Sequence, residues 1–436
     1  MLPSGLFLYF SFMKIEKLHE LFLQFPNACT DTRKITPNCM FFALKGENFN
    51  GNTYAQKALE NGAAYAIVDD EKYVTIKNTI LVSNVLETLQ QLANFHRNYF
   101  KTQVIALTGS NGKTTTKELI NAVLATSYKT IATIGNLNNH IGVPLTLLSI
   151  KKDTEIAIVE MGANHQKEIA FLCTIAEPDF GYITNFGKAH LEGFGSEEGV
   201  IKGKSELYDF LIKKDKSIFF NADDAIQLSK LSTYINKYGF SQSDAKYYLI
   251  KLRSADPFVT IEVENSTITS KLIGAYNFIN CCAAIIVGKY FNVPLAQIKN
   301  GIESYVPSNN RSQIIEKNGY QIILDAYNAN PSSMQVALEN FNNLKAKHKI
   351  VFLGDMFELG DSAKIEHQAI ADLATAMNFN STLLVGENFF ATNTNEKLFE
   401  TFEDLSTYLK NTKLEKSSIL IKGSRGMALE RILELL

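Results

Sequence analysis

The feature that most constrains the fold is the segment VIALTGSNGKTTTK, where an apolar run passes through a glycine-rich loop into a helix-forming stretch. Residues 103–108 have the character of a buried strand, and Lys113 stands where a helix would begin. Glycines let successive N–H groups of such a loop point at phosphate oxygens, and the helix N-terminus adds partial positive charge. A strand, this loop and a helix in succession therefore predict an α/β fold with a phosphate-binding edge.

The loop carries the residue types that a nucleoside triphosphate with magnesium needs. Lys113 would lie against the terminal phosphates, and Thr114 or Thr115 offers a hydroxyl to the metal ion. The spacing is GxxGKTT and not the common GxxxxGKT, because Leu107 stands at the place of the first glycine. A glycine turn without a nucleotide is the alternative, although Gly-Lys-Thr at a strand-to-helix junction has little other structural use. The predicted phosphate-binding residues are Gly109, Ser110, Asn111, Gly112, Lys113, Thr114 and Thr115.

The chain of 436 residues is longer than the roughly 250 to 300 residues at which single cores stop growing. We predict three domains, at residues 1–100, 101–306 and 307–436. Short apolar runs predict a small α/β first domain that closes with a helix over residues 85–100. Alternating strands and helices predict a mostly parallel central sheet, and the alternating pattern of residues 247–273 predicts an antiparallel insertion. Four buried-strand candidates with helices between them predict a Rossmann-like third domain.

Composition narrows the class of protein. With 46% hydrophobic residues, 20% charged residues and a net charge of -2, the chain is globular and has no basic cluster for nucleic acid. Its five cysteines lack the spacing of a zinc site or a disulfide framework, so we expect reduced thiols and a cytoplasmic location. The apolar stretch 6–13 is too short to span a bilayer. Residues 1–12 are either a genuine extension or a leader before a start at Met13, and we expect no stable membrane insertion.

Two polar side chains follow later strand-like runs. Glu160 ends EIAIVE, and His190 lies just past ITNF. A strand-end Glu is more often a cap or a surface charge, and a lone histidine is usually a satisfied polar residue. Because the carboxyl ends of parallel strands open on one edge of a sheet, we expect Lys113, Glu160 and His190 to converge there. Lys202 and Lys204, by composition alone, are solvated charges of a helix.

Six motifs, the glycine loop among them, resemble those of the Mur ligases and occur in family order: GSNGKTT, EMGANHQKEIA, ITNFGKAHLEGFGS, DAYNANPSSM, LGDMFELG and KGSRG. Together with TDTR at 30–33 and FFALKGENFNG at 41–51, the resemblance covers the chain after about Lys14. It implies a three-domain ATP-dependent ligase of peptidoglycan precursor synthesis. The DAYNANP and LGDMFELG motifs, and the lack of DNPR, resemble the branch that adds D-alanyl-D-alanine to UDP-N-acetylmuramoyl-tripeptide.

The resemblance also implies site residues. A lysine at the position of Lys204 is commonly carbamylated in this family and then binds magnesium, with Lys202 as the competing assignment. Tyr276 stands where a histidine is common, beside the segment that approaches adenine. The implied ligands of two magnesium ions are Thr114 or Thr115, Glu160, His190 and Lys204. The implied nucleotide contacts are Asn277 and Asn280 at adenine, Arg311 at the γ-phosphate and Asp325 at ribose. The implied contacts to the other substrates are Thr32, Arg33, Lys45 and Gly46 for the UDP moiety and Asn328, Asn330 and Arg425 for the dipeptide.

Amide formation explains why these groups would be needed. A carboxylate is a poor electrophile, so ATP would convert it to an acyl phosphate, with Lys113, His190, Lys204 and Arg311 as the catalytic set. Three alternatives stay open: a sister ligase that adds the third residue or a folylpolyglutamate synthase, a phosphotransferase that uses the same loop, and a nucleotide-binding module without activity. We expect a monomer.

Overall fold

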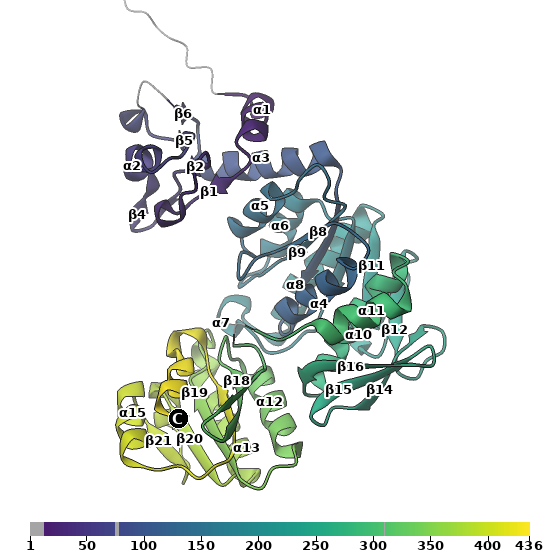
Figure 1. The fold of residues 1–436 in the computed structure, drawn as a ribbon, viewed down its shortest axis with the longest axis vertical. Coiled ribbons are helices and arrows are strands. Elements are labelled where there is room, and N and C mark those ends of the chain that lie inside the picture. Colours follow the sequence, from purple (N-terminus) through teal and green to yellow (C-terminus); the bar gives the residue numbers. More distant parts are fainter. Residues whose placement is uncertain (1–12, 75–77, 309) are drawn as a thin grey trace, which may run out of the picture. The chain divides into compact units, whose positions relative to one another are not determined.

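The structure is a computed structural model that describes residues 13–74, 78–308 and 310–436 (Figure 1). The predicted leader, residues 1–12, lies outside the described residues. The chain divides into two compact units. Of the described residues, the first unit holds those up to Val104 together with Ile131–Met161 and Phe171–Pro178. The second holds those of Ile105–Thr130, Gly162–Ala170 and Asp179–Leu436. The N-terminal sheet belongs to the first unit and the C-terminal sheet to the second, and the predicted domain boundaries stay predictions.

The first unit begins with a small parallel sheet in the strand order β1-β2-β5-β6. Its strands are β1 (Ala28–Cys29), β2 (Met40–Phe42), β5 (Tyr65–Val68) and β6 (Thr79–Leu81), and a separate antiparallel hairpin joins β3 (Lys45–Gly46) to β4 (Phe49–Asn50). The helices are α1 (Ile15–Gln24), α2 (Ala55–Glu60) and α3 (Val85–Phe100), with 3-10 turns η1 (Thr32–Lys34), η2 (Gly51–Tyr54) and η3 (Glu71–Tyr73). The predicted small α/β unit is therefore present.

Helix α3 occupies the predicted residues 85–100. Its start is fixed by Asn84, whose side chain accepts the N–H of Glu87, and its end by Lys101 in the left-handed region. The apolar face buries Leu89 and Leu92. Capping at both ends and a continuous apolar face explain why the sequence pattern located this helix correctly.

A seven-stranded sheet has the order β13-β12-β11-β10-β7-β9-β8. Its strands are β7 (Gln103–Thr108), β8 (Thr130–Ala132), β9 (Ile156–Glu160), β10 (Phe180–Ile183), β11 (Ser217–Asn221), β12 (Lys237–Ser241) and β13 (Tyr248–Leu249). Strands β7, β10, β11, β12 and β13 pair in parallel. The associated helices are α4 (Lys113–Leu124), α5 (Gly142–Leu148), α6 (Glu168–Ala176), α7 (Leu191–Phe194), α8 (Glu197–Lys213), α9 (Ala225–Lys230), α10 (Tyr276–Tyr290) and α11 (Leu295–Ser304). The predicted strand 103–108 and the mostly parallel sheet are confirmed.

The predicted antiparallel insertion is present as β14 (Lys251–Ser254), β15 (Phe258–Val263) and β16 (Ser266–Ile273). Its predicted start was wrong, because Tyr248–Leu249 forms β13 and extends the central sheet in parallel beside β12. Alternation of polar and apolar residues predicts a half-buried strand, but it does not indicate which sheet the strand joins. The pairing partner of β13 was therefore not readable from the pattern.

The C-terminal sheet has the order β17-β18-β22-β19-β20-β21. Its strands are β17 (Gln313–Lys317), β18 (Tyr320–Asp325), β19 (Lys349–Gly354), β20 (Ser381–Val385), β21 (Lys397–Phe399) and β22 (Ser418–Lys422). The sheet is parallel apart from the edge strand β17, which pairs antiparallel with β18. The helical elements are α12 (Pro331–Asn343), α13 (Ala363–Ala376), α14 (Glu387–Phe390), α15 (Phe402–Asn411), η4 (Gly360–Ser362), η5 (Arg425–Met427) and η6 (Leu429–Leu435).

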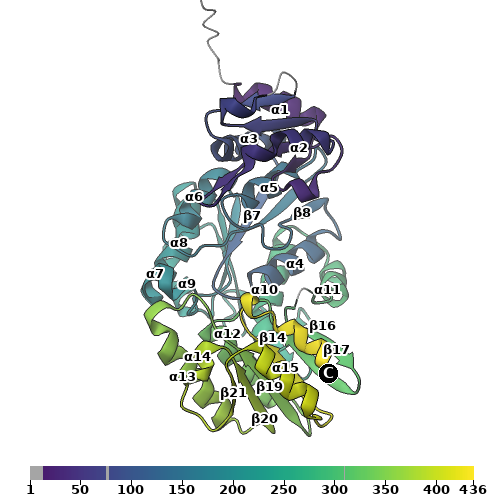
Figure 2. The same ribbon diagram turned by 90° about the vertical axis from the view of Figure 1, so that its left-hand side faces the viewer.

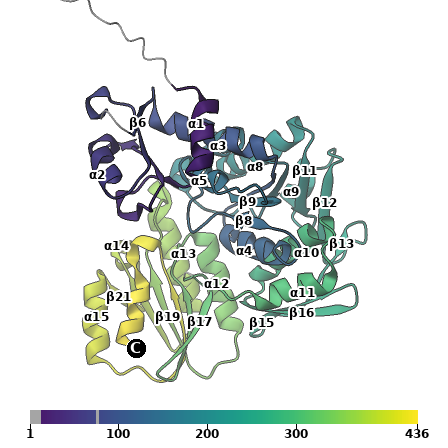
Figure 3. The same cartoon turned by 45° about the horizontal axis from the view of Figure 1, so that its top comes forward.

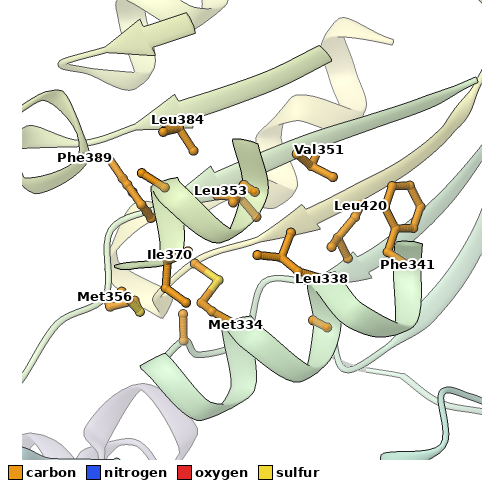
Figure 4. Close-up of a cluster of buried hydrophobic side chains, with 14 of the residues drawn as sticks. Met334, Leu338, Phe341, Val351, Leu353, Met356, Ile370, Leu384, Phe389 and Leu420 are labelled. Atoms are coloured by element: carbon orange, nitrogen blue, oxygen red, sulfur yellow. The ribbon is translucent and has the colours of Figure 1, made fainter. Parts of the chain in front are cut away.

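Helices cover both faces of this C-terminal sheet (Figures 2 and 3). On one face, Met334 and Leu338 of α12 pack with Leu353 of β19 (Figure 4). On the other face, Leu405 of α15 packs with Phe352, the neighbour of Leu353 in β19. Successive strand residues point to opposite faces, so a continuous apolar strand needs a helix layer on each side. Each such fully buried side chain contributes about 1.5 to 3 kcal/mol.

Within the described ranges, no helix combines the length and apolar character that a membrane span needs.

Candidate nucleotide and ligation site

The glycine loop between β7 and α4 has a backbone that only glycine accommodates. Gly109 has φ +144° and Gly112 has φ +78°. A Cβ on Gly112 would lie 2.6 Å from Oδ1 of Asn280, and one on Gly109 would lie 1.9 Å from Oγ1 of Thr184. Both steric limits and the positive φ values exclude larger residues. The predicted strand, loop and helix are thus present, with Lys113 at the first position of α4.

The segment after β10 braces the outer side of the loop. Oγ1 of Thr184 donates to the carbonyl of Asn111 over 2.6 Å, and Nδ2 of Asn185 donates to the same oxygen over 3.0 Å. Oγ of Ser110 donates to the carbonyl of Gly187 over 2.8 Å. These bonds follow from the parallel pairing of β10 with β7, which brings Ile183 opposite Thr108. The loop is therefore shaped before any ligand binds.

Two buried asparagines of α10 brace its inner side. Oγ1 of Thr116 donates to Oδ1 of Asn280 over 3.0 Å, and Nδ2 of Asn280 donates to Oδ1 of Asn277 over 2.8 Å. Nδ2 of Asn277 in turn donates to the carbonyl of Ile273 over 2.8 Å. Asn277 and Asn280 thus support the start of α4, a role that the sequence did not indicate. Their predicted adenine contact stays a prediction.

Two lysines lie near each other at the loop. Nζ of Lys113 donates to the carbonyls of Gly109 and Ser110 over 2.7 and 3.1 Å. Lys204 on α8 is fully buried, and its Nζ donates to the carbonyl of Ala163 over 2.9 Å. Burial, and secondly the charge of Lys113, lower the pKa of Lys204 well below its usual value. Lys204 therefore favours a neutral amine.

Lys202, the competing candidate, is exposed on the same helix. Carbamylation requires the neutral amine, which burial of a lysine favours. Burial thus distinguishes the two positions, and it favours Lys204.

His190 stands immediately before α7, with a left-handed φ of +53°. Its Nδ1 is hydrogen-bonded to the carboxylate of Glu358, which follows β19 in the C-terminal sheet. The bond from His190, with smaller help from the charge of Lys113, lowers the pKa of Glu358. Sequence reasoning assigned no role to Glu358, although it lies in the quoted motif LGDMFELG.

Three more contacts join the C-terminal part of the second unit to the loop after β10 and to the phosphate loop. Nζ of Lys188 lies 2.9 Å from Oε1 of Glu366, and the N–H of Lys188 donates to Oγ of Ser332 over 2.8 Å. Nδ2 of Asn330 donates to Oδ1 of Asn111 over 2.8 Å. The predicted dipeptide residue Asn330 therefore touches the phosphate loop directly. Its side-chain oxygen also caps α12 by accepting the N–H of Ser333.

The remaining predicted residues of the C-terminal sheet are already partnered. The guanidinium carbon of Arg311 lies 3.6 Å from the ring centroid of Tyr327. Oδ2 of Asp325 accepts from Nζ of the buried Lys422 over 2.6 Å, which in turn reaches the carbonyl of Asn328 at 3.3 Å. Arg425 is exposed and pairs with Glu430 over 3.0 Å. The assigned contacts of these residues to nucleotide and dipeptide stay predictions.

The first unit holds the residues predicted for the UDP moiety. Nζ of Lys45, in the β3–β4 hairpin that also contains Gly46, lies 2.8 Å from Oδ1 of Asp69. Arg33 follows Thr32 in η1, is exposed, and pairs with Asp31 over 2.8 Å. Lys45 and Arg33 are therefore held at the surface by neighbouring carboxylates.

Glu160 also belongs to the first unit, so its convergence with Lys113 and His190 stays a prediction. It is buried at the end of β9, and its Oε1 accepts from Nδ2 of Asn138 over 2.8 Å. Among the described residues, no three His, Cys, Asp or Glu side chains gather in a way that could hold a metal ion. The predicted set combines Glu160 and His190 with a threonine hydroxyl and a modified Lys204. Carboxylate and hydroxyl oxygens suit Mg²⁺, and a neutral Lys204 suits carbamylation, so the donor chemistry fits the ion.

Comparison with known families covers most of the chain. The profile described as "Mur ligase family, catalytic domain" matches residues 27–105, "Mur ligase middle domain" matches 107–288, and "Mur ligase, glutamate ligase domain" matches 310–431.

The chain belongs to the Mur ligase family.

Similarity to individual Mur ligases extends over nearly the full length. The UDP-N-acetylmuramoyl-tripeptide--D-alanyl-D-alanine ligase of Bacillus subtilis is 35% identical, over 93% of this chain and 92% of its own. The ligase of the same name from Escherichia coli is 33% identical, over 93% and 92%. A crystal structure of MurF from Acinetobacter baumannii superimposes with a TM-score of 0.83 at 30% identity, over 94% of this chain and 92% of that one.

A second solved Mur ligase is the MurF ligase of Thermotoga maritima in complex with ADP. It has a TM-score of 0.82 at 27% identity and covers 95% of this chain and 97% of its own. The predicted fold class, three α/β domains around a mostly parallel central sheet, is confirmed by these neighbours.

Proposed function

We propose that this Mur ligase uses ATP to join D-alanyl-D-alanine to UDP-N-acetylmuramoyl-tripeptide, a step of peptidoglycan precursor synthesis. The observation that carries the proposal is the full-length similarity to ligases of that name, at 35% and 33% identity. The braced phosphate loop and the MurF neighbour described with ADP support the use of a nucleotide. The function matches the one implied by the sequence motifs.

The first step activates the substrate carboxylate. A carboxylate oxygen attacks the γ-phosphorus of ATP, the bond from that phosphorus to the bridging oxygen breaks, and ADP leaves. The transferring phosphoryl carries negative charge, which Lys113 from the loop and Arg311 from the C-terminal sheet would balance. Lys113 is suited to this because its ammonium already lies over the loop carbonyls of Gly109 and Ser110.

The second step forms the amide. The amine of D-alanyl-D-alanine attacks the acyl carbon, a tetrahedral intermediate forms, and phosphate leaves as the nitrogen loses a proton. An acyl phosphate hydrolyses in water, so the site must be covered while the intermediate exists. The bond between Asn111 and Asn330 ties the phosphate loop to the start of α12 and would help to cover it.

Magnesium would supply further charge neutralisation and hold the γ-phosphate in line for attack. We assign its ligands to Thr114 or Thr115, Glu160, His190 and a carbamylated Lys204, and we expect two ions. The burial of Lys204 supports this choice, because a neutral amine can take up carbon dioxide and become an oxygen ligand.

The other assignments complete the proposal. We place Thr32, Arg33, Lys45 and Gly46 at the UDP moiety, Asn277, Asn280 and Asp325 at the nucleoside of ATP, and Asn328, Asn330 and Arg425 at the dipeptide. We further propose that the enzyme acts in the cytoplasm as a monomer.

Mass spectrometry of the products tests the activity. Purified protein with UDP-N-acetylmuramoyl-tripeptide, D-alanyl-D-alanine and Mg-ATP should yield a UDP-linked pentapeptide, ADP and phosphate. A phosphotransferase would release ADP without the amine and leave a phosphorylated product. A sister ligase would accept a UDP-linked dipeptide and a diamino acid instead. The absence of a pentapeptide mass would refute the proposed function.

A further inference from the structure

The motif LGDMFELG contains two acidic side chains, Asp355 and Glu358, and the proposed reaction assigns a role to neither. Glu358 follows β19 and precedes η4, and it has a left-handed φ of +61°. This conformation is disfavoured for a residue with a Cβ, and it persists only where neighbouring contacts enforce it. The position of Glu358 in the loop therefore requires an explanation.

The loop is anchored on the side of Glu358 that leads back to β19. The N–H of Phe357 donates to Oγ of Ser424 over 3.0 Å, and the N–H of Met356 donates to Nε2 of His367 over 3.0 Å. The buried carboxylate of Asp355 accepts the N–H groups of Asn388 and Phe389. These anchors come from α13, from α14 and from the segment after β22, so they fix the path of the chain that leads from β19 to Glu358.

Glu358 uses both its side chain and its backbone to contact the loop that follows β10. Its carboxylate accepts from Nδ1 of His190, and its carbonyl accepts the N–H of Glu192 over 3.2 Å. His190 has a left-handed φ of its own, +53°. His190 and Glu358, both non-glycine residues in the left-handed region, thus contact each other between the loop after β10 and the loop after β19.

The hydrogen bond determines which nitrogen of His190 is free. When Nδ1–H donates to a carboxylate, the neutral ring keeps its lone pair on Nε2, which is the nitrogen that can bind a cation. Histidines that bind metals usually have such a partner, and its loss typically weakens metal affinity about 10- to 100-fold. A second acid of the C-terminal part, Glu366, contacts Lys188 of the same loop over 2.9 Å.

We propose that Glu358 is a positioning residue that holds His190 as its Nδ1–H tautomer, so that the cation-binding nitrogen is prepared by contact between the C-terminal sheet and the loop after β10. The inference rests on the proposed function, in which His190 binds magnesium. The contact between the loop after β19 and the loop after β10 would thus set the tautomer of one magnesium ligand, His190. A surface ion pair alone would contribute little to stability, and it would require an imidazolium protonated on both nitrogens, which leaves none to bind a cation.

The variants separate positioning from simple attraction. Glu358→Ala removes the acceptor, whereas Glu358→Gln keeps an oxygen that can accept from Nδ1 but removes the charge. Glu366→Ala is the matched control, because it removes a different acidic contact to the loop after β10, the one to Lys188. If Glu358→Ala folds poorly, Glu358→Gln still tests the proposal, because it removes the charge and keeps the acceptor, so the wild-type tautomer must persist in it.

The first readout is the tautomer itself. In the full chain with ¹⁵N-labelled histidine, the His190 signals are assigned by their loss in His190→Gln. We expect Nδ1–H with an unprotonated Nε2 in the wild type, in Glu358→Gln and in Glu366→Ala, and a mixture of tautomers in Glu358→Ala. Nε2–H in the wild type, or an unchanged ring in Glu358→Ala, would overturn the proposal.

The second readout is cation affinity, measured with Mn²⁺ by electron paramagnetic resonance on the complex with ADP. We expect Glu358→Ala to weaken Mn²⁺ binding about 10- to 100-fold, with near wild-type binding in Glu358→Gln and Glu366→Ala. Equal affinity in all four proteins would contradict the positioning role. Neither readout requires turnover, so a failure of this inference is distinguishable from a failure to make the pentapeptide.

Discussion

Asn330 donates a hydrogen bond from Nδ2 to Oδ1 of Asn111 over 2.8 Å, and this bond joins the start of α12 to the phosphate loop. The same asparagine caps α12 through its side-chain oxygen. One residue therefore begins a helix of the C-terminal sheet and holds the loop that we assign to ATP. The two roles use different atoms, so they can be separated by mutation.

Asn330→Ser should separate them. Serine is also a favoured N-cap, so the stability of the fold should change by less than about 0.5 kcal/mol. Its side chain is too short to reach Asn111, and the lost bond, worth about 0.5 to 1.5 kcal/mol, should raise the KM for ATP about two- to tenfold. Steady-state kinetics and urea unfolding check the two parts. An unchanged KM for ATP would show that the bond does not support nucleotide binding.

Gly112→Ala should damage nucleotide binding, and Gly195→Ala provides a matched control. Both glycines have φ +78°, so the backbone penalty of about 1 to 2 kcal/mol is shared. Only at Gly112 would the new Cβ meet a neighbour, Oδ1 of Asn280 at 2.6 Å, whereas nothing lies within 4 Å at Gly195. Titration with a fluorescent ADP analogue should show affinity at least about tenfold weaker for Gly112→Ala than for Gly195→Ala. Equal affinities would argue against the steric account.

Lys204→Ala should nearly abolish turnover, while Lys202→Ala on the same helix should keep it. Lys204 is buried beside the charge of Lys113, and Lys202 is exposed. If the carbamate is a metal ligand, short carboxylates added to Lys204→Ala should restore part of the rate. The assay is phosphate release with all substrates present. Wild-type activity in Lys204→Ala would eliminate the proposed role.

The first unit should lose stability in mild acid through a buried histidine pair. Nε2 of His19 in α1 lies 3.0 Å from Nδ1 of His96 in α3. Burial, and secondly the nearby His96, lower the pKa of His19 from 6.5 to about 4. Since the unfolded chain takes up this proton first, the contribution is complete above pH 6.5 and is lost as the pH falls from 6.5 towards 4.

Melting temperatures between pH 8 and pH 5 check this contribution, since those limits bracket the ordinary histidine pKa of about 6.5. Between pH 8 and pH 5, the melting temperature of the wild type should fall by more than that of His19→Gln. His165→Gln is the control, because the side chain of His165 is 65% exposed. Identical pH profiles for the wild type and His19→Gln would show that the pair does not control acid stability.

Much of the fold could be predicted because its local signals agree. The strand 103–108, the glycine loop and the helix α3 each have boundaries set by neighbouring residues, such as the Asn84 cap. The edge strand β13 was assigned to the wrong sheet, because its partner β12 is chosen by tertiary packing. Local sequence patterns predict strands, helices and helix caps, but they do not predict which strands pair.

The assigned roles of the site residues stay predictions, and the contacts that hold several of these residues were not readable from the sequence. The charge of Lys113 acts on the buried Lys204, which the motifs alone could not show. The bonds of Asn280 to Thr116 and of Glu358 to His190 join residues 164 and 168 positions apart, and no local pattern encodes them. The only available signal for Glu358 was its place in a motif that carried no assigned chemistry.

The central claim is that a carboxylate becomes an acyl phosphate before the amide forms. Transfer of ¹⁸O from the labelled terminal carboxylate of the UDP-linked tripeptide tests it directly, by mass spectrometry of the phosphate released with D-alanyl-D-alanine and Mg-ATP. The account predicts one ¹⁸O atom in each phosphate and a pentapeptide that has lost one label. A pentapeptide formed together with unlabelled phosphate would contradict it, because the lost oxygen would then have left as water.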